Sequence, residues 1–356
     1  YAHQKEALTL SWDRPSFALF MEMGTGKTKV LLDNLGTLRC QNLINGALII
    51  APKSVYTVWY HTEIPKHLNV EYEMLLWKST LREAKLRDFF EKPSTESTCV
   101  KNYSAKRTKN IIKLRKYSNY RRILSGFPTP KNPLDLYTQC NFLNPNHLGF
   151  NSIVAFRNRY CHFESIWIGN RQIDVPVGFT NLPEIEMKLK KFAYRKTKEE
   201  CLDLPEKIYV KRNVEFTEEQ ARVYNDIRTE ARANLRGKEL TVTNVITEIL
   251  RLHQVACGFF KTKEDAIEPV ANKRVDTLIE ICEDTDAKII IWATYIYNIQ
   301  QITKVLRARF GVDSTVDFYG AVSSEKRTEA IERFQNDPKC RFFVANPATG
   351  GLGITL

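Results

Sequence analysis

The sequence predicts an α/β protein with two lobes, each built around a parallel β-sheet. From Ser16 to Cys140, short apolar segments bounded by Gly or Pro alternate with helix-like stretches, the pattern of strand–helix–strand units. A second alternating region begins near Lys288. At roughly 150 residues per domain, the 356 residues suffice for about two domains with proper cores.

Individual elements follow from the same periodicity. In the first half we expect buried strands at residues 17–20 and 47–51, with a helix between them at 29–35. In the second half we expect strands at 288–293 and 341–345 and helices at 297–310 and 327–334. Thr217 followed by Gln220 is a capping-box signature, which predicts a long helical region reaching about Cys257.

Composition shifts divide the chain further. Residues 141–200 are rich in Phe, Asn, Tyr and Trp without a clean period, and Leu202–Lys207 is typical of a linker. We therefore expect four parts: a first lobe at 1–140, an insertion and linker at 141–207, a helical insertion of the second lobe at 208–270, and the second lobe at 271–356.

Charge and cysteine content limit the class of function. The chain has 53 Lys and Arg against 41 Asp and Glu, a net charge of +12 that favours a polyanionic partner such as nucleic acid. Its apolar runs are far shorter than the roughly 20 residues of a membrane-spanning helix. The eight cysteines form no C-x-x-C pair, so we expect reduced thiols, no structural zinc and an intracellular location, cytoplasmic or nucleoid-associated in a bacterial or phage-infected cell, or nuclear in a eukaryote.

A phosphate-binding loop is predicted directly after the first strand. Glycines at 24 and 26 let backbone amides approach phosphate oxygens, the Lys27 ammonium reaches the β- and γ-phosphates, and the Thr28 hydroxyl can ligate Mg²⁺. Met21 stands where the full pattern has its first glycine, and the alternative is a chance glycine turn that caps a helix. The expected ATP-binding residues of this part of the chain are Gln4, Met23, Gly24, Thr25, Gly26, Lys27 and Thr28.

Gln4 belongs to this set because its amide has the paired donor and acceptor that read an adenine edge. Taken alone, a glutamine at this position is more often an ordinary surface residue.

Several further segments resemble the motifs of the Swi/Snf-type ATPases of helicase superfamily two, in the same order. Ala51–Ser54 resembles motif Ia, Leu124–Pro128 with Leu134–Tyr137 resembles motif III, and Gly350–Leu356 resembles motif V. A closer likeness to the annealing-helicase-like branch lies in Lys101-Asn102, Leu136–Gln139, Arg159–Cys161, Thr180–Leu182 and Leu204–Lys207. The resemblance implies two RecA-like lobes with helical insertions at the lobe junction, and ATP and Mg²⁺ as cofactors.

The resemblance also implies which residues act. Lys27 and Thr28 would serve catalysis on the first lobe. From the second lobe, Gly351 would bind ATP, and Gly353 with an arginine finger beyond the sequence would complete the catalytic site. The implied nucleic-acid contacts are Lys53, Ser54, Ser125, Gly126, Arg195, Lys196 and Arg327. Between Lys101 and Arg122, nine basic and no acidic residues can track a phosphate backbone, or form a solvated helix face.

One family motif is absent from the sequence. Motif II supplies an aspartate that holds Mg²⁺ and a glutamate that positions the attacking water, and no D-E-x-H-like segment precedes Lys101-Asn102. We infer that the protein carries a further segment between Val100 and Lys101; the alternative is a deletion that leaves a dead ATPase. An intact mass clearly above 41.3 kDa would support the first interpretation.

These observations predict an ATP-dependent translocase on double-stranded DNA that remodels or anneals branched DNA or displaces bound protein. The alternatives are a strand-separating DNA or RNA helicase and a DNA-binding clamp that has lost hydrolysis. We expect double-stranded or branched DNA as the partner and no membrane.

Overall fold

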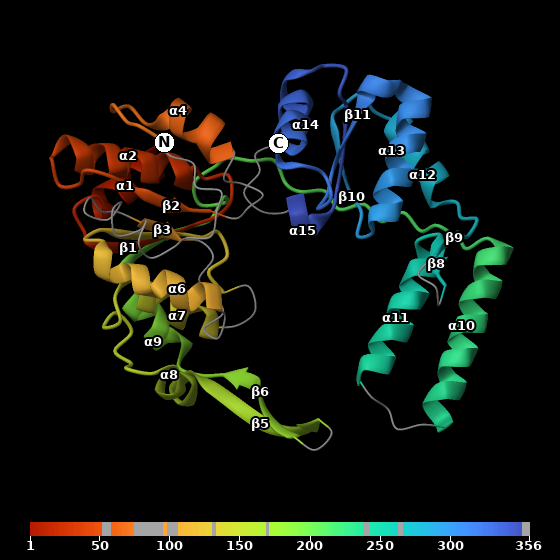
Figure 1. Cartoon of the computed structure of the whole chain (residues 1–356), viewed down its shortest axis with the longest axis horizontal. Coiled ribbons are helices and arrows are strands. Elements are labelled where there is room, and N and C mark those ends of the chain that lie inside the picture. The colour runs from red at the N-terminus through yellow and green to blue at the C-terminus, as the bar shows by residue number, and fades with distance from the viewer. Residues whose placement is uncertain are drawn as a thin grey trace. The chain divides into compact units, whose positions relative to one another are not determined.

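The computed structural model describes residues 1–51, 58–74, 95–97, 106–129, 133–168, 171–237, 242–262 and 266–350. The chain divides into two compact units at the Pro205–Glu206 peptide bond. Each unit is an α/β structure with a parallel sheet (Figure 1), which confirms the predicted fold class.

The first unit is organised around a five-stranded parallel sheet in the order β2-β3-β4-β1-β7. Its strands are β1 (Ser16–Met21), β2 (Leu48–Ile50), β3 (Thr95–Ser97), β4 (Arg121–Leu124) and β7 (Ala193–Lys196). Its helices are α1 (Ala2–Ser11), α2 (Lys27–Cys40), the π-helical turn η1 (Trp59–Glu63), α4 (Ile64–His67), α6 (Lys106–Leu114), the 3-10 turn η2 (Arg115–Tyr117), α7 (Leu134–Leu143), α8 (Ile153–Tyr160) and α9 (Leu182–Leu189).

Strand β1 lies between two hydrophobic cores, because successive side chains of a strand point to opposite faces of the sheet. Phe17, Leu19 and Met21 pack with residues of α1 and α2. Ala18 and Phe20 pack with residues of α6, α7, α8 and α9. Figure 1 shows these helices on the two sides of the sheet. All six residues of β1 are therefore buried, and the strand is a rigid base for the loop that follows it.

The hydrophobic periodicity of the sequence did not predict two parts of this unit. Strand β7 comes from a strongly basic segment and pairs with β1, with Ala18 opposite Ala193 and Met21 opposite Lys196. The antiparallel hairpin of β5 (Cys161–Ile168) and β6 (Arg171–Phe179) comes from the region without a clean period. Residues 141–205 thus form one compact unit with residues 1–140. The predicted strands at 17–20 and 47–51 are confirmed as β1 and β2, although β2 is half-buried.

The second unit contains a three-stranded parallel sheet in the order β10-β12-β11. Its strands are β10 (Ile289–Trp292), β11 (Thr315–Phe318) and β12 (Phe342–Ala345), with a short antiparallel pair of β8 (Phe259–Lys261) and β9 (Ile267–Pro269). Its helices are α10 (Glu218–Gly237), α11 (Val242–Ala256), α12 (Arg274–Glu283), α13 (Ile296–Phe310), the 3-10 turn η3 (Val312–Ser314), α14 (Ser324–Asn336) and α15 (Pro347–Gly350).

This smaller sheet also carries helices on both faces. Ile299 and Leu306 of α13 pack with Phe342 and Val344 on one face. On the other face Phe343 contacts Phe318 and Phe334, the latter from α14. The strands and helices predicted for residues 288–345 are confirmed, each within a few residues of its expected bounds.

The helical region predicted from Thr217 consists of two helices, α10 and α11, that lie side by side (Figure 1). The Thr217 hydroxyl accepts a hydrogen bond from the Gln220 N–H over 3.1 Å, so the predicted cap is confirmed. Gln220 Nε2 instead donates to the Val255 carbonyl near the end of α11, which joins the two helices. Within the described part of the chain, no helix combines the length and apolar character needed to span a membrane.

Candidate functional site

The candidate site lies where three parallel strands of the first unit end. Strand β1 is flanked by β4 and β7, and the carboxyl ends of parallel strands share one edge of a sheet. The loop after β1 occupies residues 22–26 and leads directly into α2, which begins at Lys27. Ligands of open α/β sheets bind at this kind of position, outside the carboxyl ends of the strands.

Glycine is required at two positions of this loop. Gly24 has φ +83° and Gly26 has φ +84°, which is the left-handed region that side chains with a Cβ disfavour. A Cβ on Gly26 would also lie 2.0 Å from the Gln4 amide nitrogen. The first N–H groups of α2 have no partner within the helix and carry partial positive charge, so the loop and the helix start together suit an anion.

Lys27 supplies a full positive charge at the same place. Its ammonium donates a hydrogen bond to the Glu22 carbonyl oxygen over 2.9 Å. Burial lowers the pKa of Lys27 from 10.5 to about 8, while the Glu22 carboxylate raises it and the Lys198 ammonium lowers it further. A bound polyphosphate would offset this burial cost, since it brings negative charge to the ammonium.

Helix α1 holds the middle of the loop. The Thr25 carbonyl accepts hydrogen bonds from His3 Nε2 over 2.9 Å and from Gln4 Nε2 over 3.1 Å. The Thr25 side chain is buried and its hydroxyl donates to the Glu22 carbonyl over 2.7 Å. Gln4 is therefore a half-buried loop contact and not a free surface residue. His3 gave no signal in the sequence because nothing in its local pattern predicts its contact with Thr25, 22 positions away.

The ends of β4 and β7 approach the loop from both sides. Gly126 follows β4 closely enough that a Cβ there would lie 3.2 Å from the Met23 backbone nitrogen. After β7, the Lys198 N–H donates to the Glu22 carboxylate over 2.8 Å, and the Glu22 N–H donates to the Lys196 carbonyl over 2.8 Å. Sequence reasoning missed Lys198 because its place next to the loop depends on β7.

The structure brings together most of the predicted residues of the first unit. Gln4, residues 23–28, Ser125, Gly126 and Lys196 surround or adjoin the loop, and Arg195 on β7 is exposed. Lys53, Ser54, Gly351 and Gly353 lie outside the described residues. Their predicted roles remain predictions.

Parts of the chain are similar to known proteins. The SNF2-related domain family matches residues 95–259. The chain is 24% identical to the "DNA annealing helicase and endonuclease ZRANB3" of Mus musculus, over 73% of this chain and 23% of that protein. It is also 24% identical to the "Uncharacterized ATP-dependent helicase MG018" of Mycoplasma genitalium, over 94% of this chain and 33% of that protein.

Among solved structures, the "Sulfolobus solfataricus SWI2/SNF2 ATPase core in complex with dsDNA" covers 97% of this chain and 77% of its own, with 21% identity and a TM-score of 0.45. The predicted resemblance to Swi/Snf-type ATPases is confirmed by the sequence matches. The chain spans about a quarter to a third of the length of the two curated relatives.

The basic segment from Lys101 to Arg122, whose last two residues belong to β4, has two different roles. Arg122 is buried and donates to the Ser11 carbonyl over 2.6 Å, and Arg121 donates to the Leu143 carbonyl over 2.6 Å. These arginines therefore hold the fold together. Lys109 and Lys113 of α6 are exposed and can meet a polyanion. Lys101, Lys106 and Arg107 lie where no side chain is described.

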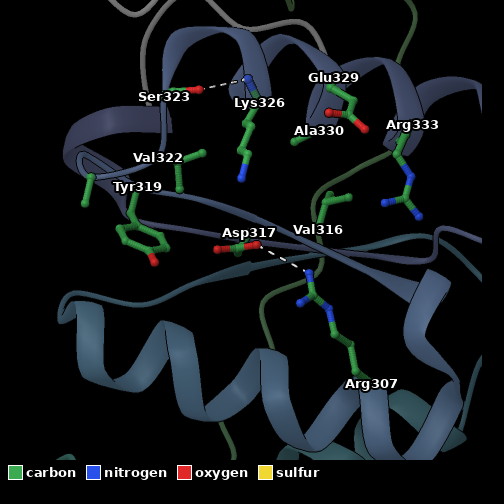
Figure 2. A pocket seen from close by; sticks show the side chains of 11 residues that line it. Arg307, Val316, Asp317, Tyr319, Val322, Ser323, Lys326, Glu329, Ala330 and Arg333 are labelled. Atoms are coloured by element: carbon green, nitrogen blue, oxygen red, sulfur yellow. Dashed lines mark hydrogen bonds and ion pairs between the residues drawn. The ribbon is translucent and has the colours of Figure 1, made fainter.

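In the second unit, Arg327 of α14 binds the loop that precedes this helix. Its guanidinium donates to the carbonyls of Val322 over 2.8 Å and Gly320 over 3.3 Å. Its neighbour Lys326 points into a cavity of about 560 Å³ beside β11, with Arg333 of α14 and Arg307 of α13 also in its wall (Figure 2). The acidic groups there are Asp317, 3.4 Å from Arg307, and Glu329.

The described residues fit the phosphates of a nucleotide better than a complete magnesium site. Thr28 provides one hydroxyl at the start of α2. The Glu22 carboxylate already accepts the Lys198 N–H. In the part of the chain that the structure describes, no three His, Cys, Asp or Glu side chains gather as metal ligands. A carboxylate for Mg²⁺ would have to come from other residues of the protein.

Proposed function

We propose that this chain is the ATP-hydrolysing core of a motor that translocates along double-stranded DNA. The observation that carries the proposal is the β1–loop–α2 arrangement, in which two left-handed glycines, a helix start and the partly buried Lys27 ammonium converge. Support for DNA as the track comes from the net charge of +12 and from relatives named as DNA annealing or ATP-dependent helicases.

Each part of the loop has a task in nucleotide binding. The amides of residues 24–28 receive the β- and γ-phosphates, and the Lys27 ammonium moves from the Glu22 carbonyl to the γ-phosphate. Gln4 uses its amide nitrogen on the Thr25 carbonyl, which leaves its oxygen to accept the adenine amino group. Met23, which is exposed next to Gly126, lies on the solvent side of the loop.

Magnesium completes the proposed chemistry by neutralising phosphate charge. We assign Thr28 as its ligand from this chain, together with a motif II aspartate that the sequence does not contain. The "SWI/SNF-related matrix-associated actin-dependent regulator of chromatin subfamily A-like protein 1 homolog" of Caenorhabditis elegans aligns over 391 positions with all of this chain. Because the chain has 356 residues, that relative carries residues without a counterpart here, as a missing motif II segment requires.

The proposed DNA contacts of the first unit include groups near the same sheet edge. Arg195 on β7 is exposed, and the half-buried Ser125 and Gly126 follow β4. Lys53 and Ser54, outside the described residues, are also proposed contacts, and Arg327 is the proposed contact of the second unit. Such groups bind the sugar–phosphate backbone, so the binding should depend weakly on DNA sequence. Branch remodelling or strand annealing is the proposed output, in line with the name of the ZRANB3 relative.

Steady-state ATP hydrolysis by the full-length protein tests the proposal. The assay compares no nucleic acid, single-stranded DNA, duplex DNA, branched DNA and RNA. Duplex or branched DNA should stimulate hydrolysis, and Lys27→Ala should abolish it. Lys29→Ala is the matched control, because Lys29 lies two residues further along α2 and pairs with Asp33. No hydrolysis with any nucleic acid would favour the hydrolysis-dead clamp.

A strand-separating helicase is the competing enzyme. A tailed duplex distinguishes the two enzymes, because a helicase releases its strands in an ATP-dependent reaction and a translocase leaves them paired. An intact mass clearly above 41.3 kDa would support the presence of the motif II segment, and a mass of 41.3 kDa would contradict it.

A further inference from the structure

A polar cluster lies in the second unit where α11 ends. Cys257 directly follows α11, and its side chain is half-buried, so small reagents reach it. The Arg274 guanidinium donates to Cys257 Sγ, with 3.2 Å between Nη1 and sulfur. His253 Nε2 lies 3.9 Å from the same sulfur atom. Two basic side chains therefore converge on one thiol.

Separate elements hold these two side chains in place. Arg274 belongs to α12, and its Nη1 also donates to the Ala256 carbonyl over 3.1 Å. His253 belongs to α11, and its Nδ1 shares a hydrogen bond of 2.8 Å with the Tyr295 hydroxyl. When Nδ1–H is the donor, Nε2 faces the thiol as a proton acceptor. The arrangement matches a nucleophile beside a base that a third group orients.

The backbone at Cys257 is also fixed. Asn298 of α13 donates from Nδ2 to the Cys257 carbonyl over 2.8 Å. Gly258 follows with φ +85°, and a Cβ there would lie 2.0 Å from Asn272 Nδ2. The sulfur position is therefore set by α11, α12 and α13 together.

The charges next to Cys257 Sγ are opposite in sign. The carboxyl end of α11 carries partial negative charge, about half an elementary charge. The Arg274 guanidinium carries a whole positive charge, binds one of those terminal carbonyls and touches the sulfur. Burial, and then the charge of Cys257, raise the pKa of Tyr295, so the tyrosine stays a neutral hydrogen-bonding partner.

We propose that Cys257 is a reactive thiol that hydroperoxides oxidise to a sulfenic acid, with Arg274 and His253 as its activating groups. The thiol proton passes to His253 Nε2, and the thiolate sulfur attacks one peroxide oxygen. The S–O bond forms as the O–O bond breaks, and two electrons pass from sulfur to the peroxide. With hydrogen peroxide the leaving hydroxide takes the proton back from His253 Nε2 and becomes water; with an alkyl hydroperoxide the leaving alkoxide takes it and becomes the alcohol.

Competition between cysteines of the native full-length protein tests this site. The protein is exposed to a low concentration of hydrogen peroxide with a cyclic 1,3-dione probe for sulfenic acid, and labelled peptides are quantified by mass spectrometry. Cys40 is an internal reference because it is exposed, and Cys201 is a second one because it is half-buried like Cys257. We expect Cys257 to be labelled about tenfold faster than either.

Two substitutions assign the cause of the reactivity. Arg274→Met and His253→Gln should each lower the labelling rate of Cys257 several-fold, and Arg274→Lys should restore part of it. An unchanged labelling rate of Cys40 and an unchanged circular dichroism spectrum show that a variant is folded. Labelling of Cys257 no faster than that of Cys40, or a rate insensitive to both Arg274→Met and His253→Gln, would overturn the proposal.

Discussion

The Lys27 ammonium and the Glu22 carbonyl oxygen are joined by a 2.9 Å hydrogen bond, so the free loop binds its own lysine side chain. The same carbonyl accepts the Thr25 hydroxyl over 2.7 Å. A nucleotide must therefore replace this contact with a better one. A phosphate can do so because it is charged, and charge-assisted hydrogen bonds are about twice as strong as neutral ones.

Nucleotide affinity should depend on pH through Lys27. Its pKa in the free protein is about 8, and a bound triphosphate favours the charged form, so binding takes up a proton above that pH. The dissociation constant for ATP should about double from pH 7 to pH 8 and then rise towards about tenfold per pH unit. Calorimetry in buffers of different ionisation enthalpy measures the proton uptake. A pH-independent dissociation constant between pH 7.5 and 9.5 would contradict this role of Lys27.

Gly26→Ala should destabilise the first unit by about 1–2 kcal/mol, the cost of a left-handed alanine. The added Cβ also displaces Gln4, but the double variant Gly26→Ala/Gln4→Ala should not recover the loss, since the backbone strain remains. Urea unfolding measures the free energy of unfolding of the single and the double variant. Gly36→Ala in α2 is the matched control, because its Cβ would have ordinary contacts of 3.8 Å and longer, and we expect no loss there.

The phosphate loop could be predicted from sequence because its determinants are local. Gly24, Gly26 and Lys27 follow an apolar strand at fixed spacing. The groups that support it could not, because His3 and Lys198 reach the loop only through the packing of α1 and β7. Strand β7 could not be predicted because its basic residues interrupt the apolar pattern that indicates a buried strand. Arg122 was also misjudged from the sequence. The basic run to which it belongs predicts a solvated or DNA-binding side chain, but Arg122 is buried and donates to a backbone carbonyl.

Acid should destabilise the first unit through His147. Its ring stacks on Phe192 at 3.9 Å and shares a 2.8 Å hydrogen bond with Ser16. Burial, and then the charge of Arg121, lower its pKa from 6.5 to about 4. Between these values the unfolded chain binds the proton and the folded chain does not, so stability falls as pH drops from 6.5 to 4. His147→Gln should lose less stability across this window in urea titrations, and equal slopes would exclude the effect.

Arg122→Met should cost about 2–3 kcal/mol, because the carbonyls of Ser11 and Trp12 lose a charged donor. Chemical denaturation measures the loss. A change below about 0.5 kcal/mol would mean that Arg122 does not hold this part of the fold.

Substitutions of Lys109 and Lys113, unlike that of Arg122, should affect DNA binding and not the stability of the fold. Both are exposed on α6, so Lys109→Ala and Lys113→Ala should leave stability nearly unchanged. If they contact DNA phosphates, each substitution should weaken duplex binding and reduce the salt dependence of the affinity by about one counterion. Fluorescence anisotropy at several salt concentrations measures this slope. An unchanged slope would assign the two lysines to a solvated helix face.

Displacement of a third strand from duplex DNA by the full-length protein tests the central claim most directly, because it reports movement along a duplex without strand separation. We predict that ATP drives displacement of the third strand while the duplex stays paired, that Lys27→Ala abolishes it, and that Lys29→Ala retains it. Displacement that is independent of ATP or unaffected by Lys27→Ala, or separation of the duplex itself, would contradict a translocating motor powered at this loop.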